Sequence, residues 1–155
     1  TRQRGGDVAK YLLLFDLQWI GGTRMGENVK LASFALKHLG REGLAAEPLL
    51  RAQIAALDIE LSSFQAMLDR YRDEAAAGAA VGAKSSLLKY YATELAVKRQ
   101  ETMLTILGTA GLDLDGPEAK AAIDWLGSLP NRIGGGTSEI QLNVVAKRVL
   151  ELPGA

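Results

Sequence analysis

A long helix is predicted most clearly by EPLLRAQIAALDIELSSFQAMLDRY, residues 47–71. Its apolar residues alternate steps of four and three without a miss: Leu50, Ile54, Leu57, Leu61, Phe64, Leu68 and Tyr71. This spacing lines one side of a helix that packs nearly parallel or antiparallel to its neighbours, as in a bundle. Pro48 suits the first helical position, because its fixed backbone angle is helical and its missing N–H has no partner there. The stretch therefore predicts a bundle helix that begins at Pro48.

Helical periodicity continues on both sides of this stretch. Upstream, a helix is predicted over residues 8–40, either unbroken across its glycines at 21, 22 and 26 or as two helices that meet there; we favour one helix, ended by Gly40-Arg41-Glu42-Gly43. Downstream, helices are predicted over residues 85–107 and 117–126. No stretch alternates apolar and polar residues as a half-buried strand does.

The predicted fold class is all-α, an antiparallel up-down four-helix bundle with an additional short helix. Short connections make consecutive helices antiparallel neighbours. We expect residues 1–6 to be a linker from a preceding domain and residues 7–155 to form the bundle domain. Thr1 suggests that the sequence begins within a longer protein.

Composition excludes several classes of function. The 18 Lys and Arg residues balance 18 Asp and Glu residues, so no long-range field draws in nucleic acid. With no Cys and one His, a metal site is not expected. The apolar run from Tyr11 to Phe15 is cut by Asp16 and is too short to span a bilayer. We therefore expect a cytoplasmic protein without a membrane span.

A glycine-rich stretch precedes the last predicted helix. Residues 134–136 are three consecutive glycines, which cannot sustain a helix, and Thr137 or Ser138 can then cap a new one. Ser138 and Gln141 have the spacing of a capping box. The apolar residues that follow at helical spacing are Ile140, Val144, Val145, Val149 and Leu152, before Pro153-Gly154. A bare backbone entering a helix N-terminus suits an anion or a carbonyl-rich ligand, although an ordinary capped connection has the same pattern.

Four segments of the chain resemble one known family. The tail Gly136-Thr137-Ser138-Glu139-Ile140-Gln141, with the run from Asn143 to Leu150, resembles the C-terminal signature of acyl-CoA dehydrogenases. Tyr91-Ala92-Thr93-Glu94-Leu95 and Ile106-Leu107-Gly108-Thr109-Ala110-Gly111 are similar to the family's third bundle helix and its glycine-rich end. Residues 5–16 resemble the point where the family's middle β-domain meets its first C-terminal helix. The resemblance covers essentially the whole chain, as the C-terminal helical domain alone.

The resemblance implies an FAD enzyme that removes two hydrogens from the α and β carbons of an acyl-CoA, of fatty acid or sterol side-chain type. Most members take the α-proton with a glutamate just before Gly-Thr-Ser, where this chain has Gly135. Others, such as the isovaleryl type, carry it on the first C-terminal helix, where this chain has Gln18. Neither glycine nor a glutamine amide can act as a base. No catalytic residue is therefore expected in this chain, whereas Gly136, Thr137 and Glu139 are the implied cofactor-binding residues.

Two further flavin contacts of the family are not matched. Its Arg-Lys-Thr-Phe segment is represented only by residues 40–43, and its Gln-x-x-Gly-Gly by residues 105–109. The resemblance implies same-family subunits as partners, in a homo- or hetero-tetramer, or a dimer for this segment alone. The first hypothesis is a subunit without its own base, in a heteromeric assembly whose other subunit carries the glutamate. The alternatives are an active dehydrogenase with a relocated base such as Asp16, and a flavin-free helical interaction or scaffold module.

Overall fold

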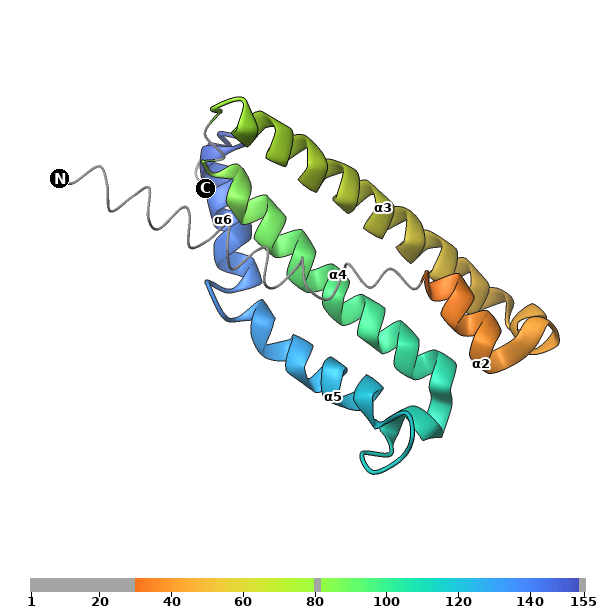
Figure 1. The fold of residues 1–155 in the computed structure, drawn as a ribbon. Coiled ribbons are helices and arrows are strands. Elements are labelled where there is room, and N and C mark those ends of the chain that lie inside the picture. Colours follow the sequence, from red (N-terminus) through yellow and green to blue (C-terminus); the bar gives the residue numbers. More distant parts are fainter. Residues whose placement is uncertain (1–29, 80–81, 154–155) are drawn as a thin grey trace.

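The computed structural model describes residues 30–79 and 82–153, and the predicted linker over residues 1–6 lies outside them. Within these ranges the chain is all-helical and contains no strand, which confirms the predicted fold class (Figure 1). The α-helices are α2 (Leu31–Ala46), α3 (Pro48–Ala76), α4 (Lys84–Leu107), α5 (Ala119–Ser128) and α6 (Ser138–Arg148). Two short 3-10 helices join them, η1 (Gly108–Leu112) after α4 and η2 (Leu129–Arg132) after α5.

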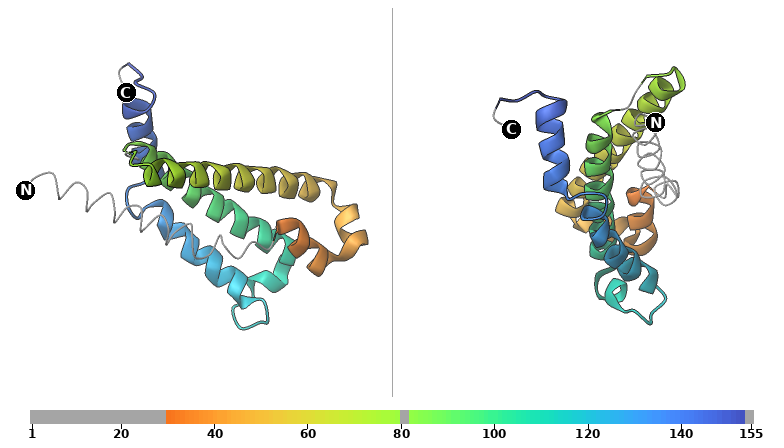
Figure 2. Two further views of the ribbon diagram at one scale, coloured as in Figure 1. Left: turned by 45° about the horizontal axis from the view of Figure 1, so that its top comes forward. Right: turned by 90° about the vertical axis from the view of Figure 1, so that its left-hand side faces the viewer.

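Helix α4 is the centre of the described fold. It runs antiparallel to α3 on one side and to α5 on the other, as Figure 1 shows, and it also contacts α2 and α6. The two views of Figure 2 show α6 beside the N-terminal part of α4, away from the end where η1 begins. The glycine-rich stretch before α6 is thereby placed against α4.

The core lies where α3 meets α2 and α4. Four of the predicted seam residues of α3 are buried there, and the other three pack partly buried against the same cluster. The buried members from all three helices are Leu31, Ala35, Leu50, Ile54, Leu57, Phe64, Leu88, Ala92, Leu95 and Ile106. Each large apolar side chain removed from water contributes about 1.5–3 kcal/mol, so this cluster fixes α4 against α3.

Three helix boundaries can be compared with the sequence. Helix α3 begins at Pro48 as predicted, and α4 begins one residue before the predicted Ser85. The helix expected to end at residues 40–43 does break at Gly40, and a second helical run then continues to Ala46. Gly40 has φ +68°, a conformation that glycine adopts without steric penalty, so one helical run stops there and a second follows. The part of the predicted helix before residue 30 lies outside the described residues.

The last helix is shorter than its apolar pattern predicts. Helix α6 ends at Arg148, Val149 is its C-cap, and Glu151 has φ +52°. Backbone carbonyls of α6 accept from the N–H groups of Leu150 and Leu152, which fold back over the helix end in place of a further turn. In the described part of the chain, no helix combines the length and the apolar character that crossing a membrane demands.

Candidate functional site

The candidate site is the glycine loop, residues 133–136, which connects η2 to α6. Gly135 has φ +70° and Gly136 has φ +103°, both in the region that favours glycine. A Cβ on Gly136 would lie 2.7 Å from Nε2 of Gln141, whereas a Cβ on Gly135 would have no atom within 4 Å. Glycine is therefore needed at position 136 by both backbone angle and space, and at position 135 by backbone angle alone.

Thr137 is the N-cap of α6. Its Oγ1 accepts the backbone N–H of Ile140 at 3.4 Å, which satisfies one donor of the first helical turn. The predicted capping box of Ser138 and Gln141 is wrong. Ser138 Oγ donates instead to Glu94 of α4 at 2.6 Å, and Gln141 Nε2 donates to the Gly135 carbonyl at 2.9 Å. Both side chains therefore bind partners outside α6 and do not cap its first backbone N–H groups.

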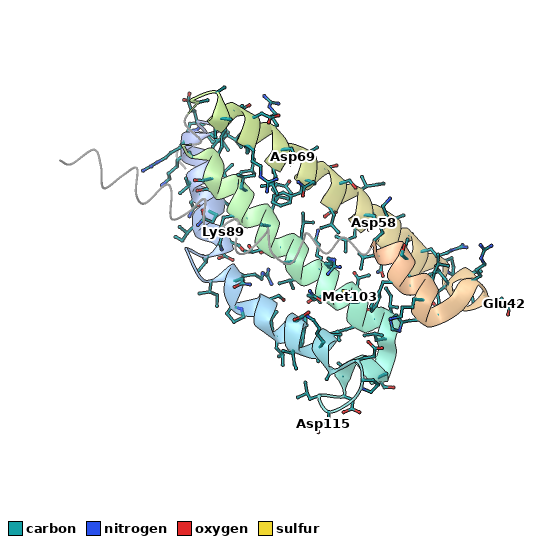
Figure 3. The ribbon with its side chains drawn as sticks, in the orientation of Figure 1. Glu42, Asp58, Asp69, Lys89, Met103 and Asp115 are labelled. Carbon is teal, nitrogen blue, oxygen red and sulfur yellow. The ribbon has the colours of Figure 1, made fainter. Side chains whose placement is uncertain are left out.

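Lys89 of α4 is only 4% exposed and lies under the glycine loop. Its Nζ donates to the Gly136 carbonyl at 2.7 Å and to the Arg132 carbonyl at 3.2 Å. Figure 3 shows Lys89 in the N-terminal half of α4, near α6. Burial lowers the pKa of Lys89, and the nearby carboxylates of Glu94 and Glu139 partly oppose that shift. A buried ammonium thus joins the two ends of the loop to α4.

Glu94, one turn further along α4, holds the residues that flank the loop. Its Oε1 accepts from Arg132 Nε at 2.9 Å and from Ser138 Oγ at 2.6 Å. Thr93 between them is fully buried and donates to the Lys89 carbonyl of its own helix at 3.0 Å. The glycine loop is therefore fastened to one face of α4 by an ammonium below it and a carboxylate beside it.

Glu139 lies in the first turn of α6 and its side chain is exposed. Its own backbone N–H lowers the pKa of the Glu139 carboxyl, and the Thr137 side chain lowers it further. A negative charge in the first turn of a helix is also favoured by the helix dipole. Glu139 is therefore anionic near neutral pH and faces solvent beside the glycine loop.

The structure brings together four of the residues singled out in the sequence. Gly135, Gly136, Thr137 and Glu139 share the glycine loop and the first turn of α6. Gln18, the other position of the missing base, lies outside the described residues, as does Asp16. Among residues 30–79 and 82–153, no group of three His, Cys, Asp or Glu side chains could hold a metal ion.

Sequence reasoning gave no site role to Lys89 or Glu94, and it gave Gln141 the wrong role, that of a capping-box partner of Ser138. Lys89 and Thr93 stand four residues apart on α4, and both are buried. A lysine on the same helical face as Ala92 and Thr93 was a usable signal, because small neighbours leave room for another backbone to approach. Its carbonyl partners, 43 and 47 residues away, carry no sequence signal.

Comparison with known proteins gives the family. The family described as "Acyl-CoA dehydrogenase, C-terminal domain" matches residues 25–150. The chain belongs to this acyl-CoA dehydrogenase family. The match includes the glycine loop and every helix that the structure describes, so it confirms the family resemblance for these parts of the chain, while residues 5–16 lie outside it.

The fold is similar to that of a solved flavoprotein. The structure described as "FAD complex of PigA" matches with a TM-score of 0.67 and 19% sequence identity, over 90% of this chain and 38% of that chain. At this identity the likeness shows a shared fold. No curated protein matches the chain. The chain spans about two fifths of the length of this structural neighbour.

Proposed function

We propose that this chain is the C-terminal helical domain of an acyl-CoA dehydrogenase-like flavoprotein subunit that lacks the proton-abstracting glutamate. It would work in a heteromeric assembly, with a same-family subunit that carries the glutamate. The single observation behind this proposal is Gly135, an exposed position without a side chain where most of the family has its base. The proposed domain is residues 7–155, preceded by a linker over residues 1–6.

The chemistry of the family requires a base beside the α carbon of the acyl-CoA. Among the residues described near the glycine loop, two carboxylates are candidates for this base, those of Glu94 and Glu139. Glu94 accepts hydrogen bonds from Arg132 and Ser138, which occupy its carboxylate. The pKa of Glu139 is lowered by hydrogen bonds, which makes its carboxylate a weaker base. Neither replaces the glutamate absent at position 135.

The residues of the loop fit FAD, the cofactor of the family. Thr137 has a half-buried hydroxyl at the start of α6, and helix N-termini offer N–H donors to phosphate and carbonyl oxygens. Gly136 supplies the positive φ of +103° with which the backbone enters this helix N-terminus. Glu139 adds an exposed acceptor for N–H or hydroxyl groups. FAD would supply the acceptor of the substrate hydride, while these three residues would bind and orient it.

We further propose that the partners are an acyl-CoA, of fatty acid or sterol side-chain type, and other subunits of the same family. A tetramer is the assembly that the resemblance favours, and a chain without cysteine is compatible with the cytoplasmic location that we propose. The balanced charge of the chain, 18 basic against 18 acidic residues, supports a role without nucleic acid.

The experiment is to express the full-length gene product alone and together with same-family proteins encoded beside it. Flavin absorbance, oligomeric state and acyl-CoA dehydrogenation with an artificial electron acceptor are measured for each preparation. We expect no turnover from the protein alone and turnover from a hetero-oligomer, lost when the partner's glutamate becomes glutamine. A homotetramer that turns over unaided refutes the proposal, and Asp16→Asn then tests a relocated base. A flavin-free protein points instead to a scaffold role.

Two matched variants at position 135 sharpen this test. Gly135→Glu restores a carboxylate at the family's position, and Gly135→Gln introduces the same length and the same backbone strain without a base. A Cβ at this position has nothing within 4 Å, so either side chain can leave the backbone without a clash at its first atom. We expect turnover above that of the original protein from Gly135→Glu only, in preparations that bind FAD. Equal activity of the two variants would show that position 135 is not the vacated base.

A further inference from the structure

The most unusual side chain in the described structure is the buried Lys89. An ammonium carries three donors and a full charge, and burying it is unfavourable unless it is hydrogen-bonded. Packing between α4 and α6 does not require it, because an unbranched apolar side chain such as methionine fills a similar volume. The charge must therefore be explained by what the ammonium binds.

Both acceptors of Lys89 are backbone carbonyls at the two ends of the glycine loop. One belongs to Arg132, the last residue of η2, and the other to Gly136, the residue before the N-cap of α6. The loop between them includes two glycines with positive φ, which on their own leave the backbone free to adopt many conformations. One ammonium that binds both ends closes the loop.

The bond to Gly136 also sets the direction of the next N–H group. The Gly136 carbonyl and the Thr137 N–H belong to one peptide unit, and the described chain contains no cis peptide bond. In a trans peptide these two groups point in opposite directions. Because the carbonyl points down to Lys89, the Thr137 N–H points away from α4. Gln141 holds the neighbouring carbonyl of Gly135 in the same way, at 2.9 Å.

We propose that Lys89 is a positioning residue of the cofactor site: its ammonium closes the glycine loop by holding the Arg132 and Gly136 carbonyls and so turns the Thr137 N–H outward, toward the bound cofactor. The cofactor part rests on the proposed function, whereas loop closure does not. Glu94 supports the closure from the side by binding Arg132 and Ser138. The loop thus stays ordered although position 135 carries no side chain.

The test compares Lys89→Met with Lys98→Met in the full-length protein. Lys98 lies on the same helix but is exposed, and its Nζ forms an ion pair with Glu60 at 3.1 Å. Amide hydrogen exchange is followed without FAD at Gly134 and Gly136, whose N–H groups donate to the carbonyls of Pro130 and Ile133. FAD affinity is measured separately by flavin fluorescence.

We expect Lys89→Met to speed exchange at these two loop amides at least about tenfold, with no change at the core amides of α3, and to raise the Kd for FAD by a similar factor. Lys98→Met should change neither quantity. If Lys89→Met does not fold, Lys89→Gln, which keeps a polar end, should show the same local effect to a smaller extent.

Each other result overturns a distinct part of the proposal. Unchanged protection at Gly134 and Gly136 in the Lys89 variant refutes loop closure. Lost protection with unchanged FAD affinity refutes the positioning of the cofactor. An original protein that binds no FAD refutes the proposed function, while the exchange measurement still decides whether Lys89 closes the loop.

Discussion

Alanine substitutions at the two adjacent glycines of the loop should differ in cost, although both glycines have positive φ. At Gly135 a new Cβ meets nothing within 4 Å, so only backbone strain opposes Gly135→Ala. At Gly136 the new Cβ would lie 2.7 Å from Nε2 of Gln141, a side chain that is 6% exposed. Gly136→Ala must therefore also displace Gln141 from the Gly135 carbonyl.

The magnitudes follow from these two terms. A non-glycine residue held at positive φ costs about 1–2 kcal/mol, which we expect as the whole loss for Gly135→Ala. Displacing Gln141 leaves its buried side-chain amide without the Gly135 carbonyl as partner, which costs about 1–3 kcal/mol more. We therefore expect Gly136→Ala to lower the free energy of unfolding by about 2–5 kcal/mol in total.

Equilibrium urea unfolding of the full-length protein measures both losses. The dependence of the unfolding free energy on urea concentration is compared between variants to confirm that each unfolds in the same way. The control is a double-mutant cycle of Gly136→Ala with Gln141→Ala, in which the shorter residue 141 leaves room for the new Cβ. The double variant should lose less than the sum of the single losses by at least about 0.5 kcal/mol. Equal losses at the two glycines, or strict additivity in the cycle, would contradict the close approach of Gln141 to the loop.

Three further perturbations test other parts of the structure. Phe64→Ala removes a core side chain that is 4% exposed and should cost about 3–5 kcal/mol, whereas Ile59→Ala, 68% exposed on the same helix, should stay within about 0.5 kcal/mol in urea unfolding. Similar losses for the two would contradict the assigned face of α3. Thr137→Ala removes the N-cap of α6 and should cost about 1 kcal/mol, while Thr137→Ser should restore most of it. The ion pairs with Lys84 and with Arg70 lower the pKa of Glu74, so their stabilising contribution is present above the ordinary glutamate pKa and is lost as the pH falls through the lowered value. Glu74→Gln removes both pairs and should therefore flatten the pH dependence of stability in this acidic range, and an unchanged profile would show that the two pairs contribute nothing.

The seam of α3 was predictable because this helix buries one face. Its seven seam residues face the cluster shared with α2 and α4, and most residues on its other sides are exposed. The pattern of α4 was less informative. Its buried residues include Leu88, Lys89, Thr93 and Val97, which do not fall on one narrow helical stripe. A helix that contacts neighbours on several sides has no single apolar face for periodicity to detect.

The backbone of the site, a glycine loop followed by a helix start, was predictable from the sequence. The side-chain hydrogen bonds that hold it to α4 were not. Consecutive glycines and a following threonine indicate a loop and a helix start from local chemistry alone, and Thr137 is indeed the N-cap. The roles of Ser138 and Glu94 depend on each other across 44 residues. The capping-box spacing of Ser138 was a valid local signal, but a carboxylate from another helix binds a hydroxyl more strongly than a backbone donor does.

The central place of α4 has a consequence for how the domain unfolds. Among the described elements, α2 and α3 pack on one side of this helix and α5 and α6 on another, and the two pairs share no extensive packing with each other. If α4 unfolds, the surfaces of both pairs that pack against it become exposed to solvent. The outer helices therefore lose their packing together. A substitution that destabilises α4 should make the domain unfold as a single cooperative unit rather than helix by helix.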